Sequence, residues 1–337
     1  MNYSIKMVMC ASDLTEEWDE IAGEYFKSKT FLCYLEKYNP CNQRYYELYS
    51  GDEFRAGIIM YTFTLDLLMF LHIPSPVKMH IIGVPVSVCS SGFVGREDDI
   101  MVALQFVFRM EKGIILGLNT EPDFEIPSLV IMPTLPVIEM QLPFLTLEEY
   151  KNTLRSSYRR HFSRNRELFN GTTSITGRCA LITPQVYELY EQVFNKTKTK
   201  LEKLSYEFFR SLPDPFVVTI YYYRDEPLTW HVVLKDTKTL FFFFGGINYK
   251  YNRQFSAYFN NLIGIVEKAI SEKYQCLNLG STAEIAKLRL GGKIARKNMF
   301  VYHRNPLVKG LFRLFRGLLA YNTEFPISHV FRESEDV

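Results

Sequence analysis

The sequence predicts a mixed α/β (α+β) fold of two similar units in tandem, each a mostly antiparallel sheet flanked by helices. The chain has 337 residues, enough for two domains of ordinary size. Its 47% apolar and 15% aromatic residues are typical of a folded protein with a large core. The order strand, turn, strand, strand, loop, helix, strand occurs twice along the chain.

The second copy of this order has the clearer pattern. "FVVTIYYY" (216–223), "LTWHVVL" and "TLFFFFGG" are rich in β-branched and aromatic residues, and the turns "RDEP" and "DTK" separate them. They predict an antiparallel meander. After the loop "INYKYNRQ", the segment "FSAYFNNLIGIVEKAISEKY" has apolar residues at helical spacing, and the buried strand "CLNL" follows.

The first copy repeats the order. "RYYELYS", "FRAGIIMYTFT" and "KMHIIGVPVSV" predict strands, "DIMVALQFVFRMEKG" an amphipathic helix and "IILGLN" a buried strand. We interpret this as duplication of one α/β unit, the alternative being the coincidence of two ordinary patterns. The predicted division is 1–145 for the first unit, 146–305 for the second, and 306–337 for a C-terminal amphipathic helix and tail.

The segment between the two copies carries two predictions. Residues 126–145, "IPSLVIMPTLPVIEMQLPFL", are apolar, but four prolines argue against a membrane span and favour buried strands joined by proline turns. Thr146 and Glu149 have the spacing of a capping box, which predicts a long helix from about Leu147 to Phe169.

The stretch "NLGSTAEIAKLRLGGK" (278–293) has the composition of a short helix specified at both ends. A nucleotide phosphate loop is excluded, because Lys287 stands where that motif needs its first glycine. Ser281 and Glu284 predict a capping box, and Gly291-Gly292 supplies the left-handed residue that ends a helix. The sequence therefore predicts a strand that turns sharply at Gly280 into a capped helix.

These motifs resemble those of the GCN5-related N-acetyltransferase (GNAT) fold, and two such units in tandem resemble the Fem-type aminoacyl and peptidyl transferases and related GNAT-like proteins of peptidoglycan biosynthesis. The resemblance is clear from about 150 to 305 and weaker over 1–145. It implies an N-acyltransferase that moves an acyl group from acyl-CoA, or an aminoacyl group from aminoacyl-tRNA, to an amine by direct attack in a ternary complex.

The resemblance also implies a donor site. In that family two central strands splay apart and the donor's carrier arm lies between them. Here the carrier strand would be Leu240 to Gly246, opened at its two glycines, with pyrophosphate at the N-terminus of the helix that begins near Phe255. Ser256 and Tyr258 depart from the family's glycine pattern, which favours either a donor other than coenzyme A or a non-catalytic binding protein. The implied donor-binding residues are Phe244, Gly245, Gly246, Arg253, Gln254, Phe255, Ser256 and Ala257.

Three residues are candidates for catalysis. Lys287 in "AKLRLGG" matches the Fem phenylalanine-lysine motif, which implies an ammonium that stabilises the developing oxyanion. The alternative is a surface lysine paired with Glu284. His231 could act as general base, although a strand histidine is more often structural, and Tyr249 could donate a proton to the departing group.

Acceptor binding is assigned to Trp230, Arg159 and Asn248. Arg159 belongs to the helix "LRSSYRRHFSRNRELF", whose arginines either grip phosphates of tRNA, a carrier or an anionic acceptor, or form a solvated basic face. The net charge of +2 gives no general case for nucleic-acid binding, so any basic site is local.

The remaining expectations concern partners and location. The acceptor would be an amine on a small molecule or a cell-envelope precursor. The six cysteines are scattered, and no His, Cys, Asp or Glu residues are clustered at metal-ligand spacing, so the sequence predicts neither disulfides nor a bound metal. Free cysteines also predict a cytoplasmic protein. The amphipathic segment 306–322 either packs on the protein or contacts a membrane interface. The alternative function is a non-catalytic tandem GNAT-like protein that binds a phosphate-bearing ligand or a membrane surface.

Overall fold

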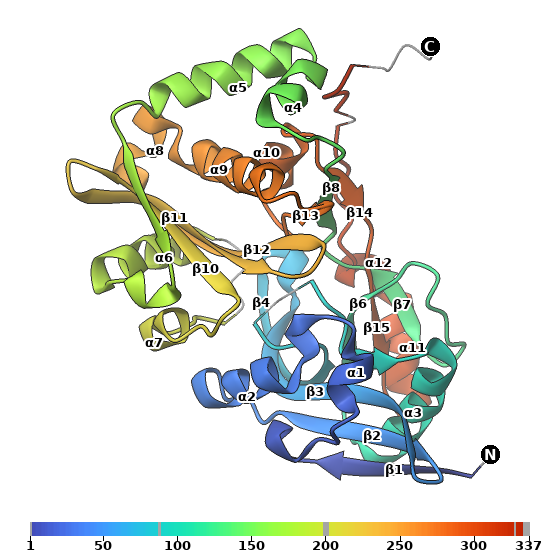
Figure 1. Ribbon diagram of the computed structural model, residues 1–337. Helices are drawn as coiled ribbons and strands as arrows, with labels where there is room; N and C mark the ends of the chain where they lie inside the picture. The colour runs from blue at the N-terminus through green and yellow to red at the C-terminus, as the bar shows by residue number, and fades with distance from the viewer. Residues whose placement is uncertain (1, 87–88, 198–201, 327, 333–337) are drawn as a thin grey trace, which may run out of the picture. The chain divides into compact units, whose positions relative to one another are not determined.

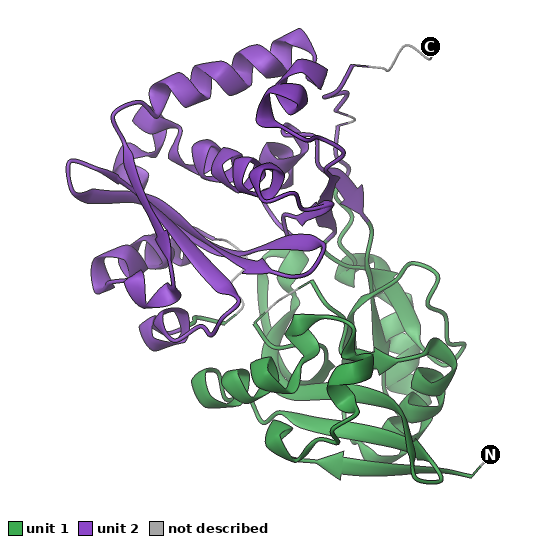
Figure 2. Ribbon diagram, in the orientation of Figure 1, with its two compact units in different colours: residues 1–135, 198–204, 296–323 green, residues 136–197, 205–295, 324–337 purple. Residues whose placement is uncertain are grey.

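The computed structural model describes residues 2–86, 89–197, 202–326 and 328–332. The chain forms two compact units (Figure 2). The first contains residues 1–135, 198–204 and 296–323, and the second contains 136–197, 205–295 and 324–337. These limits differ from the predicted boundaries at 145 and 305.

Helices flank the sheet of the first unit (Figure 1). Its elements are β1 (Tyr3–Val8), α1 (Trp18–Ala22), α2 (Lys29–Tyr38), β2 (Arg44–Ser50), β3 (Glu53–Leu68), β4 (Ile73–Ile82), β5 (Phe93–Gly95), α3 (Glu97–Met110), β6 (Ile115–Thr120), β7 (Val130–Pro133), β15 (Asn298–Tyr302), α11 (Pro306–Leu314) and α12 (Arg316–Leu319).

The second unit is built in the same way (Figure 1). Its elements are β8 (Val137–Gln141), α4 (Leu147–Thr153), α5 (Ser156–Leu168), β9 (Thr173–Gly177), α6 (Pro184–Lys196), α7 (Tyr206–Arg210), β10 (Phe216–Tyr223), β11 (Glu226–Lys235), β12 (Thr239–Ile247), α8 (Tyr249–Phe255), α9 (Ala257–Ser271), β13 (Cys276–Asn278), α10 (Glu284–Leu288) and β14 (Lys293–Ala295).

The two sheets have the same strand order. The first runs β1-β2-β3-β4-β6-β15-β7, and the second runs β9-β10-β11-β12-β13-β8-β14. In each sheet one central pair is parallel, β4 with β6 and β12 with β13. The matching order confirms the predicted tandem arrangement. Each sheet also takes its sixth strand, β15 or β8, from the other half of the chain, which explains why the compact units depart from the predicted boundaries.

The predicted meander of the second unit is confirmed. Strands β10, β11 and β12 pair antiparallel in sequence order. The apolar face of α9 packs with Leu240 and Leu277 of the parallel pair in one buried cluster. One prediction is wrong here, because the expected loop 247–254 contains the helix α8. Its start is capped by Asn248, whose side chain accepts from the N–H of Lys250.

The helix predicted over 147–169 is two helices. Its start is confirmed, because Thr146 Oγ1 accepts from the N–H of Glu149 at 3.1 Å. The helix breaks at Leu154 and Arg155. Leu154 is buried and pairs with Phe331, and the N–H of Arg155 donates to the carbonyl of Val330. Contacts with a distant chain segment thus replace the helical hydrogen bonds there.

The apolar segment 126–145 forms strands β7 and β8, as predicted. Both strands are largely buried, and each pairs with a strand of its own sheet. Among residues 2–86, 89–197, 202–326 and 328–332, no helix combines the length and the apolarity needed to cross a membrane.

The C-terminal segment packs on the first unit through one face. Phe312, Leu319 and Ala320 are buried in a cluster with residues of β6, β7 and β15. A second apolar face is open to solvent, with Leu307 77% and Leu314 74% exposed. The predicted packing is therefore present, and it leaves half of the helix's apolar surface uncovered.

This division predicts opposite results for two substitutions in α11. Phe312→Ala is expected to lower the free energy of unfolding by about 3 kcal/mol or more, because it empties a packed site. Leu314→Ala removes an exposed side chain and is expected to change it by about 0.5 kcal/mol or less. Urea unfolding of the two variants measures the difference, and equal losses would contradict the packing described.

Candidate active site

The central feature of the second unit is the point where β12 and β13 part. Their parallel ladder covers only Thr239 to Phe241 of β12, which continues to Ile247. Directly beyond the ladder the register of β12 with β11 shifts, because Val233 pairs with Phe242 and Val232 with Phe244. This β-bulge bends β12 where the ladder ends. The β12–β13 ladder thus ends at Phe241 and Asn278, and the parting of the carrier strand from its neighbour stays a prediction.

Lys287 lies beside the end of this ladder. We call this region, which is bounded by β12 beyond Phe241 and by the turn at Gly280, the wedge. Its side chain is buried, and the ammonium donates to the carbonyls of Ser281 at 2.7 Å and Gly280 at 3.3 Å. The same nitrogen is 5.8 Å from the ring centroid of Phe242, the first β12 residue beyond the ladder. The alternative of a surface lysine is therefore wrong, because the Lys287 side chain is buried beside the carrier strand.

The predicted Ser281 cap is wrong. Helix α10 begins at Glu284, and its N-cap is Ala283 in the left-handed conformation, with φ 50°. The turn is held instead by Asn278, whose side chain accepts from the N–H of Gly280, and by the Lys287 ammonium. The predicted end is confirmed, because Gly291 is left-handed at φ 93°. Both ends of α10 are therefore held by specific contacts. At the start, Asn278 and the Lys287 ammonium hold the turn that the Ser281 cap was expected to fix.

Three further groups gather beside the wedge. Burial raises the pKa of Tyr258, the second residue of α9, and the charges of Glu284 and Tyr249 raise it further. Tyr249, the first residue of α8, has a pKa raised by burial, and its ring lies 3.6 Å from the Lys196 ammonium. Sequence reasoning selected Tyr249 but missed Tyr258 and Glu284, because only the fold brings the starts of three helices together.

The predicted phosphate site at the start of α9 is partly filled by the protein. Helix α8 leads directly into α9 through Ser256, which has φ 47°. The N–H of Tyr258 already donates to Asn252 Oδ1 at 3.0 Å. Phe255 and Ala257 are buried in a small core cluster, whereas Arg253 and Gln254 are exposed. One N–H group at this helix end is therefore already occupied, and the pyrophosphate site there stays a prediction.

The two glycines of β12 have a packing role that the sequence prediction did not include. A Cβ at Gly246 would overlap Trp230 Nε1 and come within 2.8 Å of Leu189 Cβ. A Cβ at Gly245 would lie 2.7 Å from the carbonyl oxygen of Trp230. Both glycines therefore admit the neighbouring Trp230 and its backbone. Phe244, between them and the bulge, packs edge to face on Phe209.

Trp230 and His231 point to opposite faces of the sheet, as alternation predicts, but neither lines an open pocket. Trp230 is fully buried, and its Nε1 donates to the carbonyl of Val186 in α6. His231 is 1% exposed on the α9 face, where its Nδ1 bonds to Asn261 Oδ1 at 2.8 Å. The predictions of Trp230 as an acceptor-binding residue and His231 as a general base lack support, because their packing withholds both from any substrate.

The buried His231 predicts an acid-sensitive stability. Burial lowers its pKa from 6.5 to about 4. The unfolded state then binds more protons between these values, so this group destabilises the fold as the pH falls from 6.5 toward 4. Its contribution between pH 7.5 and 5 is expected to be about 2 kcal/mol. Urea unfolding at both pH values measures it, and an unchanged pH dependence in His231→Gln would contradict it.

The other two predicted acceptor residues lie apart from the wedge base. Asn248 caps α8 and donates to the carbonyl of Pro227 at 3.2 Å. Arg159 is half-buried on α5. It shares one flank of that helix with Arg166, which is paired with Glu267 at 3.0 Å. These contacts give Asn248 a structural role and leave Arg159 among the basic residues of α5.

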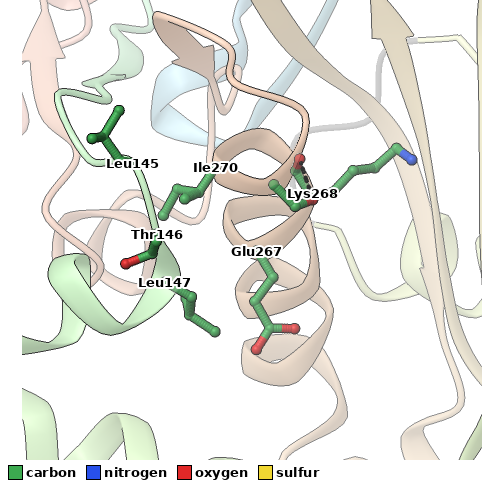
Figure 3. A pocket seen from close by; sticks show the side chains of 7 residues that line it. Leu145, Thr146, Leu147, Glu267, Lys268 and Ile270 are labelled. Carbon is green, nitrogen blue, oxygen red and sulfur yellow. Dashed lines mark hydrogen bonds between the residues drawn. The ribbon is translucent and has the colours of Figure 1, made fainter.

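A pocket of about 600 Å³ lies at the opposite, C-terminal end of α9 (Figure 3). Burial raises the pKa of its carboxylate, Glu267, and Arg166 opposes that shift. None of the predicted site residues lines this pocket. It is lined by Leu145, Thr146, Leu147, Glu267, Lys268, Ile270 and Ser271.

Within the described parts of the chain, no three His, Cys, Asp or Glu side chains are grouped so that they could hold a metal ion. The described cysteines are all free thiols.

Comparison with known proteins agrees with this fold. The family model of the acetyltransferase (GNAT) domain matches residues 152–288, which include the meander, α9 and Lys287. The crystal structure of FemX superposes with a TM-score of 0.60 at 10% identity, over 93% of this chain and 100% of that one. A conserved protein of unknown function from Bacteroides thetaiotaomicron VPI-5482 gives a TM-score of 0.53 at 12% identity, over 86% and 98%.

A search of curated proteins gives no match by sequence. The two structural relatives show the fold alone, because their identities are low. The domain match is confined to residues 152–288, which lie in the second unit except for 198–204. The chain therefore has a tandem GNAT-like fold that resembles the Fem-type transferases, and its second unit matches the acetyltransferase (GNAT) domain model.

Proposed function

We propose that the second unit is an N-acyltransferase whose donor lies in the wedge between β12 and β13 and whose acceptor is an amine. The observation that carries this proposal is the position of Lys287. A buried ammonium, held by two carbonyls of the strand-to-helix turn, lies beside the first β12 residue beyond the ladder. A bound acyl group at this point would have a fixed positive charge next to its carbonyl oxygen.

The proposed reaction is direct transfer. The amine nitrogen attacks the carbonyl carbon of a thioester or ester, the new N–C bond forms, and the bond to the carrier's sulfur or oxygen breaks. Negative charge develops on the carbonyl oxygen, and a nearby ammonium stabilises it. A proton leaves the amine, and the departing group gains one. The hydroxyl of Tyr258 would give its proton to the departing group and take up the proton of the amine, and Tyr249 is a second candidate for this relay.

The packing at the start of α9 helps to choose between the possible acyl donors. Asn252 occupies one of its N–H groups, and buried Phe255 and Ala257 narrow the approach. This favours a carrier that does not depend on a pyrophosphate at that helix end, and we therefore place aminoacyl-tRNA before acyl-CoA. The acceptor would be an amine on a small molecule or a cell-envelope precursor, and the protein would act in the cytoplasm, at the periphery of the membrane.

The experiment is a donor panel. Acetyl-CoA, longer acyl-CoAs and aminoacyl-tRNA are each added to the protein, and the shift in thermal midpoint reports a ligand that stabilises by mass action. The donor that stabilises is then labelled in its acyl group and incubated with amine acceptors. Transfer of the label to an amine is the expected result. Stabilisation by a donor without transfer to any amine would instead favour the non-catalytic binding function.

A further inference from the structure

A cluster of basic side chains lies on two helices of the second unit and has no part in the proposed chemistry. His161 and Arg164 belong to α5, and Arg289 follows α10 as its C-cap. All three are exposed. Burial lowers the pKa of His161, and the charges of Arg289 and Arg164 lower it further. Tyr150 joins the two segments, because its hydroxyl donates to the carbonyl of Leu290 at 2.9 Å and its ring packs on Phe162 of α5 at 5.9 Å between centroids. The fold therefore brings three basic groups together from segments more than 100 residues apart in sequence.

The cluster lacks the neutralisation that surface arginines usually have. Arg166, on the same helix, is paired with Glu267, and Arg178 with Asp214. No carboxylate among the described residues forms an ion pair with Arg164 or Arg289. The ring of His161 packs against Phe259 of α9 at 4.8 Å between centroids. Two unpaired guanidinium groups beside an imidazole ring that packing holds in place suit the binding of an oligoanion.

The cluster lies on elements that adjoin those of the proposed reactive residues. Phe259, which contacts His161, directly follows Tyr258 in α9. Arg289 is two residues from Lys287. Asn260 Nδ2 donates to the carbonyl of Asn165 at 2.8 Å and so fixes α5 on the first turn of α9.

We propose that His161, Arg164 and Arg289 form a phosphate-binding site for the nucleotide part of the donor. This deepens the proposed function and rests on it for the identity of the ligand. The site supplies the anion contacts that the occupied start of α9 does not. Its chemistry suits phosphate esters from two sources, a free coenzyme or the 3′ end of an RNA.

The test measures binding without turnover. Adenosine 3′,5′-bisphosphate represents the coenzyme, and an RNA hairpin with a single-stranded 3′ end represents the RNA. Affinities are measured by titration at low salt for the wild type, Arg164→Ala, Arg289→Ala and the control Arg178→Ala, which removes one exposed charge elsewhere. Each site variant is expected to weaken binding about tenfold, through one lost charge-assisted contact, and the control to leave it unchanged.

The His161 ring provides an independent readout. Its NMR titration, assigned with His161→Gln, is expected to shift to higher pH when the bisphosphate or the RNA binds, because an anion favours the imidazolium. In ligand-free Arg164→Ala, the His161 titration is expected at higher pH than in the ligand-free wild type, because a charge that disfavours the imidazolium has been removed. The probe that binds more tightly identifies the source of the phosphate, and binding by either supports the site.

The proposal is overturned if neither probe moves the His161 titration, or if all three arginine variants bind alike. This failure is separable from failure of the transferase function. Unchanged binding together with a Lys287-dependent transfer would sink only the phosphate site. Arginine-dependent binding without any transfer would leave the site standing and sink the enzyme.

Discussion

Lys287→Met is expected to lower the turnover of acyl transfer about 10² to 10³-fold while donor affinity changes little. The ammonium beside Phe242 would act on a charge that develops only in the transition state, so its loss affects turnover more than binding. Methionine keeps most of the buried aliphatic volume, which separates the loss of charge from a packing defect. Single-turnover rates at saturating donor measure the effect.

The matched control is Lys293→Met, which removes an exposed lysine six residues further along. It is expected to leave turnover unchanged. Lys287→Ala should also destabilise the fold, by about 1 to 3 kcal/mol, because the carbonyls of Gly280 and Ser281 lose a buried donor. If Lys287→Met retains full turnover and only lowers stability, the lysine stabilises the turn at Gly280 and Ser281 and has no catalytic role.

Gly246→Ala is expected to lower the free energy of unfolding by about 3 kcal/mol. The added Cβ would overlap the indole nitrogen of Trp230 and crowd Leu189, so the buried hydrogen bond from Trp230 to Val186 must shift. Denaturant unfolding measures the loss.

The control for this change is Gly310→Ala in α11, where a Cβ meets nothing within 4 Å. That variant is expected to be more stable by about 0.5 to 1 kcal/mol, since alanine favours a helix. A fully stable Gly246→Ala with impaired donor binding would favour the original interpretation of the glycines as an opening for the carrier.

Periodicity was enough to predict the strands and most helices. β10 and β2 begin and end at the predicted residues, because alternating and aromatic-rich runs are bounded there by turns. Three kinds of feature could not be predicted this way. The insertion of β8 and β15 into sheets formed mainly by the other half of the chain depends on pairing between distant segments. The break at Leu154 is caused by residues near 330. Helix α8 lies in a segment whose composition resembles a loop.

The candidate site was predicted only in part. The position of Lys287 followed from a short local pattern, and the fold brings it to the end of the β12–β13 ladder. The burial of His231 and Trp230 was not foreseen, because residue type and alternation do not reveal which helix covers a strand. Tyr258 and Arg289 were missed because their neighbours, Glu284 and His161, come from other elements.

The central claim is that the donor lies along β12 beyond its ladder with β13. Hydrogen exchange of the backbone amides, with and without the stabilising donor, tests it most directly, because a carrier bound in the wedge would slow exchange there. We predict donor-dependent protection in residues 242–247 and 280–287, retained in Lys287→Met. Protection confined to other segments, such as the pocket at the C-terminal end of α9, would contradict the claim.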